Sequence, residues 1–336
     1  MFTAVITGTG AYLPSRIVTN KELESVVATS DEWIISRTGI RERRIAAPEE
    51  ATSDLAYYAA VGALEQAGLK AENIDAIIVA TVTPDMLFPS TACILQARLG
   101  ASKAVAFDLS AACTGFIYGL ELARTAIFAG SWQHVLVVGA ETLSRIVDWE
   151  DRHTCVLFGD GAGAAVVSRV MATDEVTVPH AKNIMARILG VHLGADGSQG
   201  EVLTLPAGGS RRPATAESVL TRQHFVHMNG PEVYKFAVRI VGEAADALLS
   251  KLGLDYGDID YFIPHQANLR IIEGFAKRMK LPLSKIPINV EKYGNVSSGS
   301  IPIALHEFAP MFQPGQKIML IGFGGGLTWG ACLLEW

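Results

Sequence analysis

Hydrophobic and polar positions along this chain follow two patterns, one typical of buried strands and one typical of amphipathic helices. Short apolar runs predict buried strands at 74–81, 105–109 and 135–140. An alanine-rich amphipathic stretch predicts a helix at 52–68, and a more apolar helix is predicted to begin near Cys113 and continue to Arg124. Because strands alternate with helices, we expect a parallel or mixed sheet that is covered on both faces.

The glycine-rich segment 159–163 interrupts this pattern. It lacks the Gly-Lys-Ser/Thr ending of a phosphate-binding loop, and a strand-like Ala-Val-Val run follows it. We therefore expect a tight turn between two strands at 159–163.

The two halves of the chain resemble each other. Segment 63–78 is similar to 247–263, and in both a glycine is followed six positions later by isoleucine. Further on, Phe-Gly-Asp-Gly at 158–161 is echoed by Phe-Gly-Gly-Gly at 323–326. Between these markers, Cys113 and Asn295 each follow a lysine by ten residues. We expect a pseudo-twofold duplicate in which Cys113 and Asn295 begin equivalent helices and converge on one site.

Composition bounds the class of protein. A chain of 336 residues with 49% hydrophobic and 18% charged residues is typical of a compact globular protein with about two domains. We expect these domains at 1–175, which carries Cys113, and at 176–336, which carries the candidate histidine and asparagine. The net charge of −6 provides no general attraction to nucleic acid or to an anionic membrane.

No apolar run reaches the ~18 residues of a membrane span, so we expect a cytoplasmic protein with no membrane partner. The four cysteines form no CxxC pair, which favours reduced thiols and no metal site.

Cys113 is the first candidate for chemistry. At a strand-to-helix junction, unsatisfied backbone N–H groups and the positive helix end are expected to lower the pKa of its thiol, which would make it a nucleophile. A small buried thiol that fills a crowded junction is an equally consistent interpretation.

Two further side chains are candidates for the same site. A buried strand is predicted to end at His265, which places its side chain in a crevice at the carboxyl end of the strand. His265 and Asn295 together offer two N–H donors for an oxyanion or an enolate. Taken alone, His265 is also consistent with a structural histidine.

Two surface segments are rich in cations. Trp33 and Arg37 are suited to a nucleotide, because indole stacks on a base and guanidinium binds phosphate, although a solvated helix end is the alternative. Arg270, Lys277 and Arg278 form a basic helix end, which is either a solvated face or a docking site for an acidic partner.

At this point the chain resembles the ketoacyl-acyl-carrier-protein synthase III family of the thiolase superfamily over essentially its whole length. The segments that carry the resemblance are 29–44, 107–115, 158–164, 264–270, 294–298 and 322–330. The resemblance implies an α/β, thiolase-like duplicated fold, a five-layer αβαβα arrangement with two pseudo-twofold related mixed sheets. It also implies a homodimer.

The resemblance implies a decarboxylating Claisen condensation that initiates fatty acid synthesis. Cys113 is implied to accept the acyl group of an acyl-CoA, after which malonyl-acyl-carrier protein loses carbon dioxide and its enolate attacks the acyl-enzyme to give a 3-oxoacyl-acyl-carrier protein. His265 and Asn295 would complete the catalytic triad. The N–H groups of Cys113 and Gly325 would form the oxyanion hole.

The resemblance also implies binding residues. Trp33, Arg37 and Arg152 would contact the adenine and phosphates of CoA, and Asn268 the pantetheine arm. Phe88 would border the acyl pocket across the dimer. Arg270, Lys277 and Arg278 would lie in the carrier-protein patch. Acyl-CoA is a substrate, and no metal or other cofactor is expected.

Three alternatives remain. A related acyl-CoA-dependent condensing enzyme of secondary metabolism would use a different acceptor. A thiolase proper would carry a second catalytic cysteine near the C-terminal glycine motif, where only Cys332 follows. A non-catalytic paralogue would lose the nucleophile or a donor.

Overall fold

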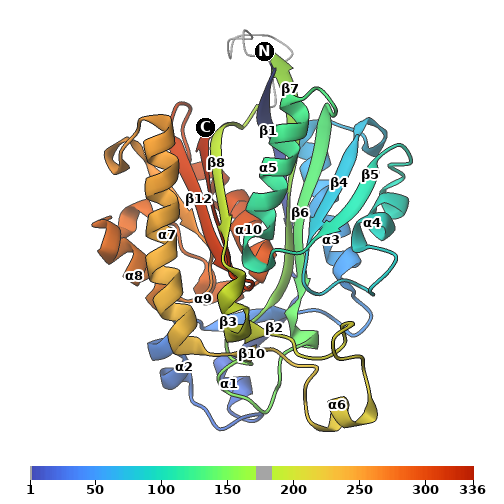
Figure 1. The fold of residues 1–336 in the computed structure, drawn as a ribbon, viewed down its shortest axis with the longest axis vertical. Helices are drawn as coiled ribbons and strands as arrows, with labels where there is room; N and C mark the ends of the chain where they lie inside the picture. The colour runs from blue at the N-terminus through green and yellow to red at the C-terminus, as the bar shows by residue number, and fades with distance from the viewer. Residues whose placement is uncertain (1, 172–183) are drawn as a thin grey trace.

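A nine-stranded mixed sheet runs through the whole molecule (Figure 1). The computed structural model describes residues 2–171 and 184–336, so the expected domain boundary at 175/176 lies outside the described residues. In spatial order the strands are β11 (Tyr261–Pro264), β12 (Lys317–Gly324), β13 (Thr328–Glu335), β8 (Ala186–Ala195), β1 (Phe2–Tyr12), β7 (Asp160–Met171), β6 (His134–Thr142), β4 (Ala76–Ala80) and β5 (Val105–Leu109).

The strand order is symmetric about the β1–β8 pair. Moving outward from that pair, one half contains β7, β6 and β4, and the other contains β13, β12 and β11. In both halves the first two neighbouring pairs are antiparallel and the third is parallel. The two half-sheets join through only two paired positions, Val5 with Arg187 and Ile6 with Ala186. The expected duplication is therefore present, and the two mixed sheets meet edge to edge at this short joint.

Helices form the remaining layers. Helices α3 (Thr52–Ala67) and α4 (Thr91–Leu99) cover the outside of the N-terminal half-sheet, and α7 (Gly230–Leu252) and α8 (Leu269–Met279) cover the outside of the C-terminal half-sheet. Between the halves lie α5 (Gly115–Phe128) and α10 (Ser300–Phe308), which contact strands of both (Figure 1). This arrangement confirms the expected five-layer thiolase-like fold.

Side-chain alternation along the strands produces three separate apolar cores. On β4, Ile77 and Val79 pack with α3 and α4, whereas Ile78 joins the central core with α5 and α10. On β12, Met319 and Ile321 face α7 and α8 in the same way. Because both faces of each half-sheet are buried, the strands read as continuous apolar runs in the sequence.

Shorter elements gather at the carboxyl ends of the parallel strands, at the bottom of Figure 1. They are β2 (Arg16–Thr19), β3 (Glu42–Ile45), β9 (Leu203–Thr204), β10 (His227–Met228), α1 (Asn20–Leu23), α2 (Asp31–Thr38), α6 (Ala216–Leu220) and α9 (Val290–Tyr293).

The 3₁₀ turns of the described residues are η1 (Ala71–Asn73), η2 (Ala112–Thr114), η3 (Leu143–Arg145), η4 (Gly197–Val202), η5 (Tyr256–Asp258), η6 (Leu283–Lys285), η7 (Ser297–Gly299) and η8 (Ala309–Met311).

The prediction of a tight turn at 159–163 is wrong. Gly161 and Gly163 lie inside β7, where they pair with Glu141 and Gly139 of β6. A Cβ at Gly163 would lie 2.6 Å from the backbone nitrogen of Ile303, so glycine here allows α10 to approach the sheet closely.

The register of the internal repeat also needs a correction. Gly68 and Gly253 are equivalent, because each ends an outer helix in the left-handed conformation, with φ of 67° and 68°. The turns η2 and η7 match in the same way, since each begins with a non-glycine residue at φ 45°, Ala112 and Ser297. Cys113 is therefore equivalent to Ser298 and not to Asn295, which precedes the turn.

Within residues 2–171 and 184–336, no helix is long and apolar enough to cross a membrane.

Candidate active site

A cavity of about 1340 Å³ opens at the carboxyl ends of the strands, between the two halves. Residues from both halves of the chain line it, and most of the sequence-predicted site residues are among them. These are Trp33, Arg37, Cys113, Arg152, His265, Asn268, Arg270 and Asn295.

Cys113 sits in the turn η2, directly after strand β5 and before helix α5. The hydroxyl of Thr114 holds the turn by donating to the Ala111 carbonyl oxygen at 2.7 Å and by bonding to the Thr328 hydroxyl at 2.7 Å. A Cβ at Gly324 would lie 2.7 Å from the Cys113 nitrogen, so the end of β12 packs directly on the backbone of Cys113. The junction thus depends on both halves of the chain.

The prediction of a lowered thiol pKa is wrong in this structure. Cys113 is only 7% exposed, and its burial raises the pKa of the thiol to about 12. The nearby Glu141 carboxylate raises the pKa of Cys113 further, whereas the Ser297 side chain lowers it. Desolvation therefore outweighs the helix end that the sequence suggested, and Cys113 is a neutral thiol here.

His265 directly follows strand β11, and its backbone N–H donates to the Ile321 carbonyl oxygen at 2.8 Å. The ring packs edge-on against Phe323, with centroids 5.7 Å apart. Both ring nitrogens are buried and have no hydrogen-bond partner among the described residues. Burial lowers the pKa of His265 to about 3, so the ring is neutral and has one N–H to donate. Since buried polar atoms are normally paired, this ring is arranged to bind a group within the cavity.

Asn295 is held by residues of the other half. Its N–H donates to the Leu157 carbonyl oxygen at 2.8 Å, and its own carbonyl oxygen accepts from the Gly159 N–H at 3.0 Å. Its side-chain Oδ1 accepts from the Ser297 N–H at 2.8 Å, which directs the amide. The Nδ2 group can then donate into the cavity, like the His265 ring.

Aromatic and cationic side chains form the outer wall of the cavity. The Arg152 guanidinium lies 5.0 Å from the centre of the Trp33 ring, and its Nη1 donates to the Ala28 carbonyl oxygen at 3.2 Å. Asn268 caps α8 by accepting from the Arg270 N–H at 2.9 Å, and its Nδ2 donates to the Arg37 carbonyl oxygen at 3.3 Å. A flat aromatic ring beside guanidinium groups is suited to a nucleotide with phosphates.

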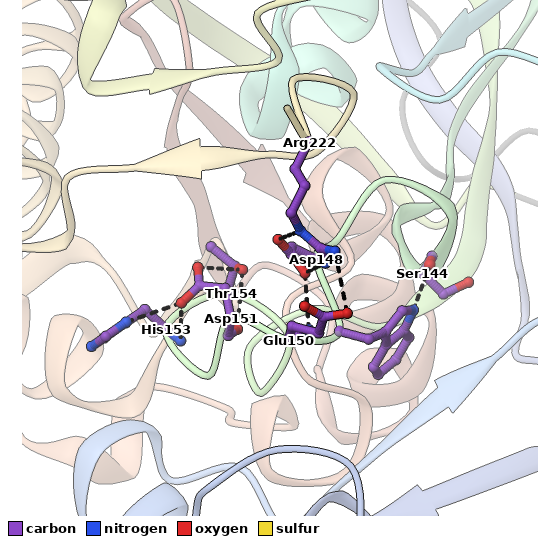
Figure 2. Close-up of polar contacts among 8 residues, drawn as sticks. Ser144, Asp148, Glu150, Asp151, His153, Thr154 and Arg222 are labelled. Atoms are coloured by element: carbon purple, nitrogen blue, oxygen red, sulfur yellow. Dashed lines mark hydrogen bonds and ion pairs between the residues drawn. The ribbon is translucent and has the colours of Figure 1, made fainter. Parts of the chain in front are cut away.

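The loop that carries Arg152 is braced by charged contacts (Figure 2). Arg222 bonds to both carboxylate oxygens of Asp148 and forms an ion pair with Glu150 at 3.2 Å. The Arg222 guanidinium lowers the pKa of Asp148. These contacts tie 148–154 to the segment around α6.

Four predicted residues do not line the cavity. Phe88 is 85% exposed on the surface of the protomer, and Lys277 and Arg278 lie at the end of α8. Gly325 follows Gly324 at the end of β12, and its carbonyl oxygen accepts from the Thr328 hydroxyl at 3.3 Å.

Sequence reasoning missed Ser297 and Glu141, which act on Cys113. Glu141 could have been found from its position, because it is the charged residue that directly follows the apolar run 135–140, at the carboxyl end of a buried strand. Nothing in the local sequence distinguishes Ser297 from its neighbours Ser298 and Ser300.

Comparisons with known proteins identify relatives of this chain. Two family models match the chain: 3-oxoacyl-[acyl-carrier-protein (ACP)] synthase III at residues 107–197 and its C-terminal part at residues 249–336. A beta-ketoacyl-[acyl-carrier-protein] synthase III of Caldanaerobacter subterraneus subsp. tengcongensis is 54% identical over 99% of this chain and 98% of its own length.

Solved structures are similar over the same span. The 3-oxoacyl-[acyl-carrier-protein] synthase III of Aquifex aeolicus VF5 has a TM-score of 0.88 and 46% identity, covering 99% of this chain and 100% of that one. A priming beta-ketosynthase from the R1128 polyketide biosynthetic pathway has a TM-score of 0.87 and a lower identity of 36%, covering 99% and 96%. The fold, the site and the full-length similarity show that the chain belongs to the family of 3-oxoacyl-[acyl-carrier-protein] synthase III enzymes.

Proposed function

We propose that this protein condenses the acyl group of an acyl-CoA with malonyl-acyl-carrier protein, giving a 3-oxoacyl-acyl-carrier protein that begins fatty acid synthesis. The observation that carries this proposal is the cavity itself. It brings a buried thiol together with an unpartnered neutral histidine and a directed amide, beneath a wall of aromatic and guanidinium groups.

In the first half-reaction, Cys113 sulfur attacks the thioester carbon of acyl-CoA. The carbon–sulfur bond to CoA breaks, and the thiol proton ends on the departing CoA sulfur. The N–H groups of Cys113 and Gly325 stabilise the oxyanion, which is consistent with the close packing of β12 on the Cys113 backbone.

In the second half-reaction, the malonyl group loses carbon dioxide. The N–H of neutral His265 and the amide of Asn295 donate to the thioester oxygen, where the enolate charge develops. The enolate carbon then attacks the acyl carbonyl and expels the Cys113 thiolate, which takes up one proton. A neutral histidine suits this role, because it donates while carrying no charge that burial would penalise.

Binding residues are assigned on the same basis. Trp33, Arg37 and Arg152 hold the adenine and phosphates of CoA, and Asn268 holds the pantetheine arm. Arg270 lies at the rim of the cavity, and Lys277 and Arg278 extend a basic surface along α8 on which an acidic carrier protein docks. Both substrates place the enzyme in the cytoplasm.

A homodimer is part of the proposal. Strand β5 is at the edge of the sheet and pairs only with β4 among the described residues, although its sequence Val-Ala-Phe-Asp-Leu is largely apolar. Val105 on this edge and Phe88 nearby in the chain are exposed at 52% and 85%. Pairing of two such edges covers both, and Phe88 then borders the acyl pocket of the partner protomer.

The test is the intact mass of the protein after incubation with a series of acyl-CoA thioesters. We expect the wild type to gain one acyl group and Cys113→Ala to gain none. Cys93→Ala is the matched control, because Cys93 is the exposed thiol and lies outside the cavity. A folded wild type that takes no acyl group from any donor would contradict the proposal. Acylation of Cys113→Ala and Cys93→Ala to the same extent would point to non-specific acylation.

A further inference from the structure

Two segments that are far apart in the chain meet at one wall of the cavity. Parts of the loop 148–154 and of the segment 222–228 both line it. The Val226 N–H donates to the Ile146 carbonyl oxygen at 2.9 Å, which joins the segment to the residues just before the loop. This wall of the cavity is therefore built from two parts, and its shape depends on how they are held together.

Arg222 ties the two parts together through its guanidinium group (Figure 2). Its Nε donates to Asp148 Oδ2 at 2.7 Å, its Nη2 donates to Asp148 Oδ1, and its Nη1 forms an ion pair with Glu150 at 3.2 Å. Two parallel bonds between a guanidinium and a carboxylate fix their orientation as well as their distance. The Asp148 side chain is only 16% exposed, so salt screens this contact less than an ordinary surface pair.

Arg222 acts on this wall from behind. It is not among the described residues that line the cavity, but its guanidinium lies 5.2 Å from the centre of the Phe225 ring, which does line it. The backbone of Arg222 has a φ of 58°, a conformation that L residues rarely adopt. Such a conformation persists only where surrounding contacts fix it, and here the contacts with Asp148 and Phe225 do so.

Asp148 passes this restraint on to the loop. Its Oδ1 also accepts from the Glu150 N–H at 2.9 Å, and its carbonyl oxygen accepts from the Asp151 N–H at 3.0 Å. Both bonds join residues that are close in sequence, so they form a tight turn that leads directly into Arg152. The guanidinium of Arg152 then lies 5.0 Å from the centre of the Trp33 ring.

We propose that Arg222 is a positioning residue for the nucleotide of CoA. By holding Asp148 it keeps Arg152 beside Trp33, where a base and phosphates can be bound together. The inference rests on the proposed function, which assigns Trp33 and Arg152 to CoA. Without the guanidinium, the loop has to be ordered when CoA binds, and this entropic cost weakens binding. Arg222 lies outside the cavity, so the rate of acyl transfer at saturation does not depend on it.

The first test is titration calorimetry with CoA. Arg222→Asn removes the guanidinium and suits the positive φ, which asparagine adopts more readily than most residues. Asp148→Asn keeps the shape of the acceptor but replaces one oxygen with an NH₂ group that faces the guanidinium. We expect each variant to bind CoA about fivefold more weakly than wild type. We expect the double variant to bind no more weakly than either single variant, because both remove the same contact.

Arg239→Asn is the matched control. Arg239 also pairs with a glutamate, Glu243, at 3.0 Å, and its guanidinium lies 5.7 Å from the centre of the Phe236 ring. It belongs to α7 and is not among the described residues that line the cavity. We expect its affinity for CoA to stay within about twofold of wild type. An equal loss in Arg239→Asn and Arg222→Asn would show that only the net charge matters, and it would overturn the inference.

The second test is the rate of acylation of Cys113, followed by intact mass at several donor concentrations. With the acyl-CoA that acylates wild type best, we expect Arg222→Asn to raise the half-saturating concentration about fivefold and to keep the limiting rate. With the pantetheine thioester of the same acid, which lacks the nucleotide, we expect wild type and Arg222→Asn to behave alike. A general loss of structure would instead lower the limiting rate with both donors.

The outcomes separate this inference from the proposed function. If Cys113 is acylated but Arg222→Asn binds CoA like wild type, or changes the reaction with both donors equally, the role of Arg222 is wrong and the proposed function stands. If Asp148→Asn binds CoA as tightly as wild type while Arg222→Asn does not, Arg222 acts through its charge and the positioning role is wrong. If wild type binds CoA but is never acylated, the proposed function fails, and weaker CoA binding by both variants would still support the role of Arg222.

Discussion

The two strand-to-helix junctions of the duplicated fold have the same backbone and carry different chemistry. Both contain a 3₁₀ turn that begins at a non-glycine residue with φ 45° and leads into a central helix, at Gly115 in one half and Ser300 in the other. The N-terminal turn contains Cys113, the proposed nucleophile. In the C-terminal half, the equivalent position is Ser298, and Asn295, whose amide is the proposed enolate donor, stands three residues earlier. The same backbone turn is therefore used for two proposed roles. In one half the functional side chain lies within the turn, and in the other half it lies just before the turn.

The junctions also differ in how they are supported. The N-terminal turn follows directly from β5, a strand of its own half. The C-terminal turn follows the short helix α9 and rests on the other half, through the bonds of Asn295 with Leu157 and Gly159. Both junctions therefore contact the other half of the chain, but the turn that contains Cys113 follows a strand, whereas Asn295 follows a short helix.

The first way to sharpen this comparison is to remove one functional group from each junction. We expect Cys113→Ala to prevent acyl transfer from acyl-CoA altogether. We expect Asn295→Ala to form the acyl-enzyme at near the wild-type rate but to lose about 10²–10³-fold in condensation, because its amide acts on the enolate. Intact mass measures the first step, and the yield of 3-oxoacyl-acyl-carrier protein measures the second. If Asn295→Ala loses acylation as strongly as condensation, the two junctions do not act in separate steps.

A second variant removes buried hydrogen bonds next to the C-terminal junction. Arg43 is completely buried beside Gly294, and it donates to the carbonyl oxygens of Val18 and Val156 and to the side chain of Asn20. We expect Arg43→Met to lower the free energy of unfolding by about 3–5 kcal/mol, because these acceptors lose their donor. Chemical denaturation measures the change.

Arg41→Met is the control for that variant. The Arg41 side chain is 65% exposed, and its ion pair with Glu291 spans 3.9 Å. We expect a loss below about 1 kcal/mol, as is usual for surface pairs. Equal losses in the two variants would show that burial of Arg43 does not matter.

A third variant strains the backbone next to Asn295. Gly294 has φ 66° and ψ −160°, a region that is essentially restricted to glycine, and a Cβ there would lie 2.9 Å from the Leu157 carbonyl oxygen. We expect Gly294→Ala to lower the free energy of unfolding by about 2–3 kcal/mol and to impair condensation more than acylation. Gly100→Ala is the comparison, because Gly100 has φ 73° with open space around it, and we expect a loss of only about 1 kcal/mol there.

The smallest expected effect is a pH dependence from His265. Its pKa of about 3 lies below the usual value of 6.5, so as the pH falls through 6.5 the unfolded chain binds a proton that the folded protein does not. Stability is therefore lost progressively between pH 6.5 and 3. We expect this group to cost about 2 kcal/mol between pH 7.5 and 5, and His265→Gln to remove that part of the slope. Denaturation of both proteins at the two pH values tests it, and parallel slopes would contradict a buried neutral ring.

The sequence was sufficient for much of the fold. Apolar runs identified the strands β4, β5 and β6, but the expected burial of β5 is wrong, because β5 is an edge strand with no buried residue and Val105 is exposed. Gly68 and Gly253 marked equivalent helix ends, because a left-handed cap restricts the residue locally. The segment 159–163 was misjudged because glycine serves there for close approach of α10, a requirement that only the packed structure reveals. The repeat was placed in the wrong register around Asn295 because the turn conformation, and not the distance from a lysine, defines equivalence.

The sequence predicted which residues line the cavity, but it did not predict the protonation state of the Cys113 thiol. The motifs and the resemblance selected Cys113, His265 and Asn295, and the cavity brings all three together. The state of the thiol depends on burial and on Glu141 and Ser297, which are distant from Cys113 in sequence and reach it only through the fold. Phe88 is exposed and the basic end of α8 lies outside the cavity, so the roles that we propose for them involve partner molecules.

The packing of β12 on Cys113 also has a consequence for biosynthesis. Cys113 leaves the ribosome first, and Gly324, which closes over its backbone, follows 211 residues later. At a synthesis rate of about 5–20 residues per second, the second follows the first by roughly 10 to 40 s. During most of that interval the thiol lacks both Asn295 and its glycine cover, so the nascent chain does not yet have the proposed oxyanion hole. With the roles proposed above, acyl transfer cannot begin until β12 has been made and has packed on Cys113.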